Sequence, residues 1–242
     1  MKDVAFLIRQ PIAHRGLHDG NKLVWENTLT AFERAIEAGY AIECDLQYAS
    51  DAEPVVFHDD DMERLCNIKA DVRSRTTAEL SLTSIGGTRD KVPSLKALLK
   101  LVKGQVPLVL ELKGRHGDDE GFASSVIEAI ENYSGELALM SFDTHLLKEL
   151  KELECPVPVG LTAEGTKEAD FANHRKAMDF GVDFISYNVM HLPNSFIAAE
   201  RAHGVPVITW TVRNAEQAAH SYAHALQITF EGFDPRAGGP GS

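Results

Sequence analysis

Cysteine and long apolar runs are scarce in this chain of 242 residues. Its three cysteines, Cys44, Cys66 and Cys155, are odd in number and widely spaced. They match neither a zinc-binding pattern nor the disulfide framework of a small secreted protein, which suits a reducing compartment. The longest early apolar run, Val4 to Ile8, is too short for the core of a signal peptide, and no run is long enough to span a membrane. The sequence therefore predicts a cytoplasmic protein.

An excess of basic charge is also missing. The chain has 24 Lys and Arg against 36 Asp and Glu, so its formal net charge is −12. A surface of this sign is not built to neutralise nucleic-acid phosphates or anionic lipid headgroups. We therefore expect no nucleic-acid partner and no insertion into membranes.

Linkers and low-complexity stretches are absent as well. At 44% hydrophobic and 25% charged residues the composition is that of a globular protein, and a chain of this length should bury about 70–75% of its unfolded surface. We expect a single domain over residues 1–242, with a small insertion at about 59–92 and a loose Gly/Pro-rich tail at 236–242.

What the chain does contain is a repeated alternation of short apolar segments and amphipathic segments of helical period. We expect strands at 11–14, 41–46, 106–112, 137–142, 158–162, 183–187, 205–212 and 226–230. We expect helices at about 27–39, 94–103, 122–133, 144–153, 168–180, 195–202 and 215–222. Strands that alternate with helices pair in parallel, and eight of them predict a (β/α)₈ barrel. A doubly wound open sheet is the alternative, but it usually has a Gly-rich phosphate-binding turn after its first strand, and this sequence has none.

The second strand does not lead into a helix. Only seven residues separate it from the apolar segment Pro54–His58, which is too few for a helical crossover. We therefore expect the strand to continue into an antiparallel β-hairpin, followed by the insertion before the second helix of the barrel. With Asp51 and Ala52 as the two turn residues, His58 lies opposite Asp45 across the ladder.

Carboxylates alternate with apolar residues at the ends of two predicted strands. Glu43 and Asp45 share one face of the second strand, and Glu111 shares a face with Lys113 on the next barrel strand. These side chains should point into the barrel mouth, where barrel enzymes keep their chemistry. Three inward carboxylates suit a hard divalent cation, Mg²⁺ or Ca²⁺, better than zinc. The alternative is an ordinary solvated strand end, with ion pairs to Lys113 and Arg15.

Two histidines end strands that reach the same mouth. His14 ends the first strand and His58 ends the hairpin strand. Paired histidines near neutral pH can supply both a base and an acid, although a single histidine at a strand end is more often a structural, hydrogen-bonded residue. His18 and His116 could overhang the same site.

Cationic and aromatic residues complete the candidate site. Arg15 and Lys113 offer donors to an anionic oxygen, which an enzyme of net charge −12 needs if its substrate is an anion. Trp210 lies on the seventh strand and either forms an apolar wall of the mouth or packs in the core.

Five short motifs, taken together and in order, resemble the signature of the glycerophosphodiester phosphodiesterase family. They are His14-Arg15-Gly16, Glu26-Asn27-Thr28, Glu43-Cys44-Asp45, Val55-Val56-Phe57-His58-Asp59 and Glu111-Leu112-Lys113. The resemblance runs from about Pro11 to Val212. It implies a divalent-metal TIM barrel that cleaves glycerophosphodiesters to sn-glycerol 3-phosphate and an alcohol.

Residue by residue, the resemblance implies three roles. Metal ligation falls to Glu43, Asp45 and Glu111. Acid–base work falls to His14 and His58, and phosphate contacts fall to Arg15 and Lys113. Ser141-Phe142 and Trp210 also match family positions on later strands.

The chain departs from the family pattern at two places. The hairpin turn reads Asp51-Ala52 where the family usually has Asp-Gly; a left-handed residue there would be mildly strained, whereas other turn types tolerate alanine. The last strand, Gln227 to Phe233, lacks the Ile-Thr-Asp-x-Pro-like end that is common in the family. This second departure concerns the loop that closes the barrel, and with it the contacts to the leaving alcohol.

We therefore interpret the chain as a metal-dependent phosphodiesterase for a small-molecule glycerophosphodiester, with His58 as the acid and His14 as the base. One alternative is a lysophospholipase D-like activity on lipid-bearing diesters, which an apolar groove beside Trp210 would favour. Others are a non-catalytic phosphodiester-binding barrel and a metal-assisted proton abstraction next to a carboxylate, although the latter leaves His14 and Arg15 without a role. The oligomeric state stays open.

Overall fold

The computed structural model describes residues 2–115 and 117–237. The expected overhang of His116 and most of the expected tail, residues 238–242, lie outside the described residues.

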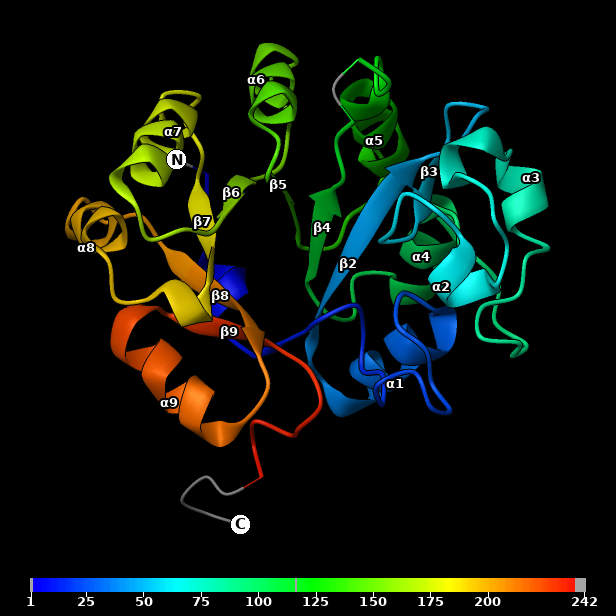
Figure 1. Ribbon diagram of the computed structural model, residues 1–242, viewed down its shortest axis with the longest axis horizontal. Coiled ribbons are helices and arrows are strands. Elements are labelled where there is room, and N and C mark those ends of the chain that lie inside the picture. The colour runs from blue at the N-terminus through cyan, green and yellow to red at the C-terminus, as the bar shows by residue number, and fades with distance from the viewer. Residues whose placement is uncertain (1, 116, 238–242) are drawn as a thin grey trace.

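Within the described residues, eight parallel strands close into a barrel (Figure 1). They are β1 (Ile12–Ala13), β2 (Ala41–Tyr48), β4 (Leu108–Leu112), β5 (Leu137–Ser141), β6 (Val159–Ala163), β7 (Phe184–Asn188), β8 (Val207–Val212) and β9 (Gln227–Phe230). Neighbours follow the order β1-β9-β8-β7-β6-β5-β4-β2, and β1 also pairs with β2, which closes the ring. The predicted eight-stranded barrel is confirmed, and the open-sheet alternative is wrong.

Helices surround the strands on the outside of the ring (Figure 1). They are α1 (Leu29–Ala38), α4 (Leu95–Val102), α5 (Phe122–Ile130), α6 (Thr144–Glu152), α7 (Glu168–Met178), α8 (Ser195–Ala202) and α9 (Ala215–His224). Polar residues fix several starts: the side chains of Thr28, Ser94 and Asn214 accept hydrogen bonds from backbone N–H groups three residues later. Every strand and helix expected from the sequence is present, with ends shifted by a few residues.

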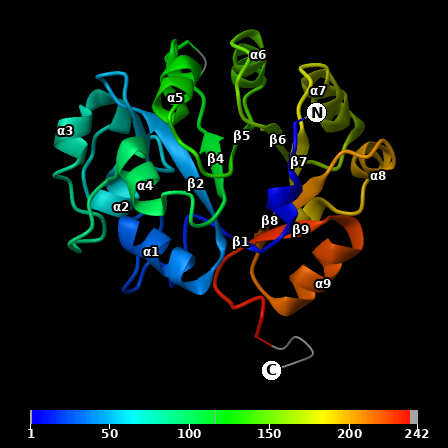
Figure 2. The ribbon, with the colours of Figure 1, turned by 180° about the vertical axis from the view of Figure 1, so that it is seen from behind.

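Two apolar layers hold the barrel together. In β2 the side chains of Ile42, Cys44 and Leu46 belong to the large core between strands and helices. The second layer fills the barrel interior, where Phe6 and Leu7 of the short 3₁₀ helix η1 (Ala5–Ile8) pack with the inner side chains of the strands. In Figure 2, η1 lies in front of the strands. The N-terminal end of the barrel is therefore plugged, and the polar site lies at the carboxyl ends.

The hairpin after β2 is present, but its predicted register is wrong by one residue. β3 (Pro54–Val56) runs antiparallel to β2, with Leu46 opposite Val56. Asp45 therefore faces Phe57 rather than His58, and the backbone N–H of Phe57 donates to the Asp45 carbonyl oxygen at 3.0 Å. The physical reason is the turn: three residues form it instead of two, and Ala52 has φ 65° in the left-handed region.

The segment between β3 and α4 has its own apolar cluster. It contains α2 (Glu63–Cys66), the 3₁₀ helix η2 (Val72–Ser74) and α3 (Thr77–Leu80). Phe57, Leu65, Leu80 and Ile85 are buried in this cluster, which is separate from the barrel core. The segment lies over the side of the ring that carries β2 and β4 (Figure 1).

Helix α9 packs against β8 and β9, and no helix follows β9 in the part of the chain that the structure describes; the chain continues there as a coil. The Arg236 guanidinium lies over the Tyr40 ring at 3.9 Å and donates to the Ala38 carbonyl oxygen. Tyr40 in turn packs edge-on against Phe230 of β9. Among the described residues no helix is both long and apolar enough to cross a membrane.

Candidate active site

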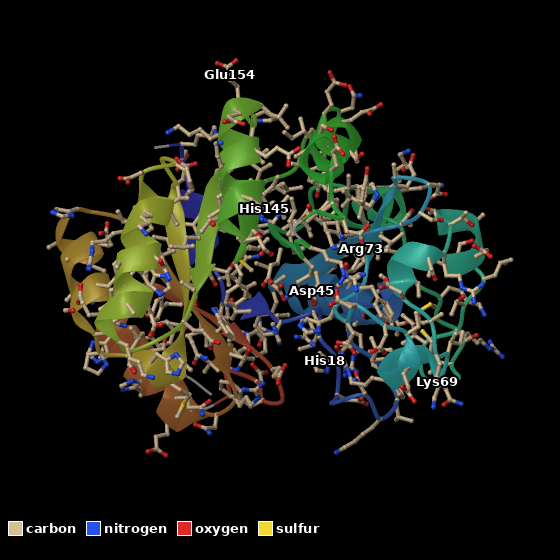
Figure 3. The ribbon with its side chains drawn as sticks, turned by 45° about the horizontal axis from the view of Figure 1, so that its top comes forward. His18, Asp45, Lys69, Arg73, His145 and Glu154 are labelled. Atoms are coloured by element: carbon tan, nitrogen blue, oxygen red, sulfur yellow. The ribbon has the colours of Figure 1, made fainter. Side chains whose placement is uncertain are left out.

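Three carboxylates meet inside the barrel mouth, as predicted. Glu43 and Asp45 come from β2 and Glu111 from β4, and the strand register puts Asp45 beside Glu111. One oxygen of each lies within 4.8 Å of the others, and all three side chains are buried. Asp45 is near the middle of Figure 3, whereas Lys69 and Glu154 lie at the edge of the molecule. The cluster could hold a metal ion.

Positive side chains compensate only part of this buried charge. Burial would raise the pKa of Asp45, but Lys113 and Arg15 outweigh it and hold the pKa of this carboxyl below its usual range. The Lys113 ammonium is 2.9 Å from Asp45 and also pairs with Glu111. Burial, with the neighbouring carboxylates, raises the pKa of Glu43 well above its usual value, and burial raises the pKa of Glu111. The ion pairs named in the alternative interpretation are present, although the carboxylates are buried rather than solvated, and the excess negative charge that remains fits a divalent cation.

His14 follows directly on β1 and points at this cluster. Its Nε2 lies 3.9 Å from a Glu43 oxygen, and its Nδ1 lies 2.6 Å from a Glu231 oxygen. Burial lowers the pKa of His14, although the hydrogen bond with Glu231 opposes the shift. The first histidine therefore has one ring nitrogen anchored and the other facing the carboxylates.

His58 is likewise anchored through its Nδ1 nitrogen. Its Nδ1 lies 2.7 Å from Asp59 Oδ1, and its side chain lines the same cavity as His14. Burial lowers the pKa of His58, and the charge of Asp45 opposes this. The predicted convergence of the two histidines is present despite the wrong register: both line the same cavity, and β3 already ends at Val56, before His58.

Arg15 is fixed at the centre of the site. Its backbone has φ 55°, and its backbone N–H donates to Glu43 at 2.9 Å. Its side chain reaches Asp45 at 3.2 Å and Glu26 at 2.6 Å. Asn27 donates to the same Asp45 oxygen at 2.8 Å. Glu26 and Asn27, from one sequence motif, thus bind Arg15 and Asp45, the charged groups of two other motifs.

Arginines of the segment between β3 and α4 reach the mouth from above. Arg64 of α2 makes hydrogen bonds to both Glu26 and Asp59. Arg73 of η2, labelled in Figure 3, donates to the Lys113 carbonyl oxygen at 2.7 Å. Arg64 thus connects Asp59, which binds His58, with Glu26, which binds Arg15.

An aromatic wall borders the cavity, whose volume is about 290 Å³. Trp210 of β8 and Phe142, just after β5, line it and pack edge to face with ring centres 5.4 Å apart. The Trp210 indole N–H donates to the Ser186 carbonyl oxygen at 3.2 Å, which fixes the ring. Of the two expectations for Trp210, an apolar wall of the mouth or packing in the core, the structure shows the wall.

Other predicted residues lie elsewhere. His18 lies close to the carboxylate that holds His14, 3.6 Å from Glu231, and does not line the cavity. Ser141 is buried and donates to the Leu112 carbonyl oxygen at 2.7 Å, a contact between neighbouring strands.

Glu231, Arg64 and Arg213 were not singled out from the sequence. Glu231 binds His14, Arg64 binds the Asp59 carboxylate beside His58, and Arg213 lines the cavity. Glu231 falls in the closing strand end that departs from the family pattern, so that departure was the only signal for it. Arg64 carries no signal of its own, because it lies on a helix of one turn in the insertion.

Comparison with known proteins decides the family. The profile of the Glycerophosphoryl diester phosphodiesterase family matches residues 14–229. The chain belongs to this family. YhdW of Bacillus subtilis (strain 168) is 27% identical to it over 217 residues, which cover 86% of this chain and 88% of YhdW. A glycerophosphodiester phosphodiesterase of Caldanaerobacter subterraneus is 27% identical over 215 residues, with 85% and 86% of the two chains covered.

Solved structures agree with the fold. A phosphodiesterase of Oleispira antarctica, in complex with the product sn-glycerol-3-phosphate, superposes with a TM-score of 0.83 at 22% identity, and the match covers 95% of each chain. A glycerophosphodiester phosphodiesterase of Thermotoga maritima superposes with a TM-score of 0.73 at 24% identity, over 92% of this chain and 94% of the other. The protein is thus an enzyme with the TIM-barrel fold of the glycerophosphodiester phosphodiesterases.

Proposed function

We propose that this enzyme hydrolyses glycerophosphodiesters to sn-glycerol 3-phosphate and an alcohol. One observation carries the proposal: two histidines, each anchored through Nδ1, face three buried carboxylates across one cavity. The family match supports the reaction class, and the Oleispira antarctica relative binds sn-glycerol-3-phosphate.

Glu43, Asp45 and Glu111 would hold the divalent cation, Mg²⁺ or Ca²⁺. Their donor set is all oxygen and carries more negative charge than Lys113 and Arg15 compensate. When bound, such an ion acts as a Lewis acid on the phosphoryl group. The Lys113 ammonium and the Arg15 guanidinium lie beside the same carboxylates and would donate to the phosphate oxygens.

Two histidines can divide the proton transfers. His14 would accept the proton of the nucleophile at Nε2, and His58 would give a proton to the leaving alkoxide, so that one proton is taken up for each one released. Both water and the substrate's own glycerol hydroxyl are suitable nucleophiles; in the second case a cyclic phosphate forms first.

A second candidate is a lysophospholipase D-like reaction on lipid-bearing diesters. A groove of about 480 Å³ adjoins the cavity at Phe142, whose side chain is 40% exposed, and Leu161, Ala163 and Phe180 line it. Its wall also contains Glu164 and other polar residues, so a small polar alcohol fits it as well. Turnover that rises with the length of the acyl chain would favour this second candidate.

The decisive experiment is an assay of glycerol 3-phosphate release from a panel of glycerophosphodiesters, with and without a chelator. We expect release from small diesters, loss of release in chelator, and recovery with added Mg²⁺ or Ca²⁺. Full activity in excess chelator, or a requirement for zinc alone, would reject the oxygen-donor metal site. Absence of release from every diester, with metal present, would reject the proposed reaction.

A further inference from the structure

Glu231 occupies a special place just beyond β9, the strand that closes the barrel. Its backbone N–H donates to the Val212 carbonyl oxygen at 3.0 Å, which ties it to β8. One carboxylate oxygen lies 2.6 Å from His14 Nδ1 and 3.6 Å from His18 Nε2. The other oxygen accepts from Arg213 Nε at 2.8 Å. Side chains from both ends of the chain therefore converge on one carboxylate.

The contact with His14 fixes which ring nitrogen carries the proton. An ionised carboxylate can only accept, so His14 Nδ1 must be the donor in this hydrogen bond. In a neutral ring the lone pair is then on Nε2, the nitrogen that lies 3.9 Å from Glu43. The backbone N–H of His14 also donates to the Phe230 carbonyl oxygen at 2.9 Å, so the same strand end holds both the main chain and the ring.

The carboxylate itself has two further neighbours, of which one donates a hydrogen bond to it. His18 Nδ1 accepts the Gly20 backbone N–H at 3.1 Å, so a neutral His18 carries its proton on Nε2, which faces Glu231. Arg213 approaches the other oxygen. Rotation of the Glu231 side chain away from His14 would therefore break the hydrogen bond from Arg213 and move the carboxylate away from His18.

The second histidine has the same construction from unrelated segments. His58 Nδ1 faces Asp59, and Arg64 holds that carboxylate through two nitrogens at 2.7 and 2.9 Å. Both histidines are thus backed by a carboxylate that an arginine fixes in turn. Repetition in two independent places argues that the arrangement serves the histidines rather than local packing alone.

We propose that Glu231 is a positioning residue for the reaction, which holds His14 as the Nδ1-protonated tautomer and directs Nε2 at the metal-binding carboxylates. When Nε2 takes a proton from the nucleophile, the ring becomes an imidazolium, and its positive charge lies beside the Glu231 carboxylate. The inference rests on the proposed function, because it takes His14 to be a proton carrier.

The kinetic test uses Glu231→Gln. Glutamine has nearly the same shape, but it has only one acceptor oxygen and therefore cannot accept hydrogen bonds from both His14 and Arg213. We expect kcat for glycerophosphodiesters to fall about 10–100-fold, the usual effect of losing such a supporting carboxylate, with KM within about twofold. Glu231→Asp, which keeps the charge, should recover part of the loss. The matched control is Glu216→Gln, the same substitution at an exposed position in the first turn of α9, and it should retain wild-type kcat.

A double-mutant cycle shows whether Glu231 acts through His14. In a His14→Ala background, Glu231→Gln should lower kcat by less than about a further twofold, because the histidine that Glu231 positions is gone. A further tenfold loss in that background, or wild-type kcat in the single variant, would overturn the inference.

Nitrogen-15 NMR of the histidine rings gives a readout that does not depend on activity. The wild-type protein should show His14 protonated at Nδ1, and Glu231→Gln should shift it toward a mixture of tautomers, whereas Glu216→Gln should leave the signal unchanged. A wild-type His14 protonated at Nε2 would overturn the inference. Wild-type protein that shows the Nδ1 tautomer but releases no glycerol 3-phosphate would instead reject the proposed function and leave the Glu231 contact standing.

Discussion

At the residue scale, the cluster of Glu43, Asp45 and Glu111 combines crowding with burial. Three carboxylates within 4.8 Å of one another repel, and Lys113 and Arg15 offset only part of this. Such a group is costly to keep in a folded protein unless a cation uses it. The arrangement therefore makes a specific prediction about the metal.

Neutral isosteres of the three proposed ligands should each remove most activity. We expect Glu43→Gln, Asp45→Asn or Glu111→Gln to lower kcat by at least about 10²-fold, because each removes one charged carboxylate from the proposed metal site, which has few others. Glycerol 3-phosphate release at saturating Mg²⁺ measures the loss. Glu37→Gln, on an exposed position of α1, is the control and should behave like the wild type. Near-normal rates in any of the three variants would exclude that residue as a ligand.

The two histidines can be told apart by the leaving group. If His58 is the acid, His58→Ala should be slow on alkyl diesters, whose leaving alkoxide needs a proton. A p-nitrophenolate leaving group needs little protonation, so the loss of rate on a p-nitrophenyl ester should be smaller by about 10²–10⁴-fold. His14→Ala should lose similar activity on both substrates if His14 is the base. Rates of both variants on both esters check this assignment. Selective recovery of His14→Ala would exchange the roles, and equal losses everywhere would remove them.

At the element scale, the segment between β3 and α4 is joined to the barrel mouth through an ion pair between a half-exposed arginine and a buried glutamate. Arg64 binds Glu26, which also binds Arg15. Burial would raise the pKa of Glu26, but the hydrogen bonds from Arg64 and the charge of Arg15 lower it from 4.5 to about 2. A lowered carboxyl pKa contributes stability that is present above about 4.5 and is lost as the pH falls toward 2.

Glu26→Gln should therefore destabilise the protein in a pH-dependent way. A shift of this size corresponds to about 3 kcal/mol at pH 7, as an upper figure. Urea unfolding at pH 7, 4.5 and 3 should show nearly the same gap between variant and wild type at pH 7 and 4.5, and a clearly smaller gap at pH 3. A gap that stays constant over this range would mean that the Glu26 charge contributes nothing, and that the loss comes from packing alone.

The hairpin turn makes an opposite prediction, a gain in stability. Ala52 has φ 65°, a conformation that costs an L-residue about 1–2 kcal/mol, whereas glycine adopts it freely. Ala52→Gly should therefore stabilise the protein by about 0.5–1 kcal/mol, after the greater freedom of glycine in the unfolded chain is subtracted. Ala198→Gly, at an exposed position within α8, should do the reverse by about 1 kcal/mol. Urea midpoints that move in the same direction for both would contradict this explanation.

The same turn shows what the sequence could and could not predict at this scale. Alternation along a strand depends only on neighbouring residues, so the convergence of Glu43, Asp45 and Glu111 follows from the pattern itself. The register of the hairpin depends on whether Ala52 takes a left-handed conformation, which a residue with a Cβ usually avoids.

Loop contacts between distant segments are harder still. Glu231 lies 217 positions from His14, and its contact forms only because the ring of strands closes. No local periodicity encodes such a pair. The same holds for the contact of Arg64 with Glu26, which lies 38 positions away.

At the scale of the whole molecule, stability and chemistry lie at opposite ends of the barrel. Phe6 and Leu7 of η1 plug the N-terminal end with apolar packing, and the charged cluster occupies the carboxyl ends. This is the division that barrel enzymes generally show. Substitutions in the apolar plug should consequently lower the stability and leave kcat unchanged, whereas substitutions in the charged cluster should lower kcat and leave the stability unchanged or higher.

Leu7→Ala and Glu43→Gln test this division as a pair. Leu7 is 1% exposed, so its truncation should cost about 2–5 kcal/mol of unfolding free energy while kcat of the folded protein stays within about twofold of the wild type. Glu43→Gln should remove activity, yet in metal-free protein it should be at least as stable as the wild type, because it relieves repulsion with Asp45 and Glu111. Urea unfolding in chelator, together with kcat under conditions where each variant is folded, measures both effects. A tenfold fall in kcat for folded Leu7→Ala, or a loss of stability in Glu43→Gln as large as that in Leu7→Ala, would show that the two ends are coupled and that the plug also supports the site.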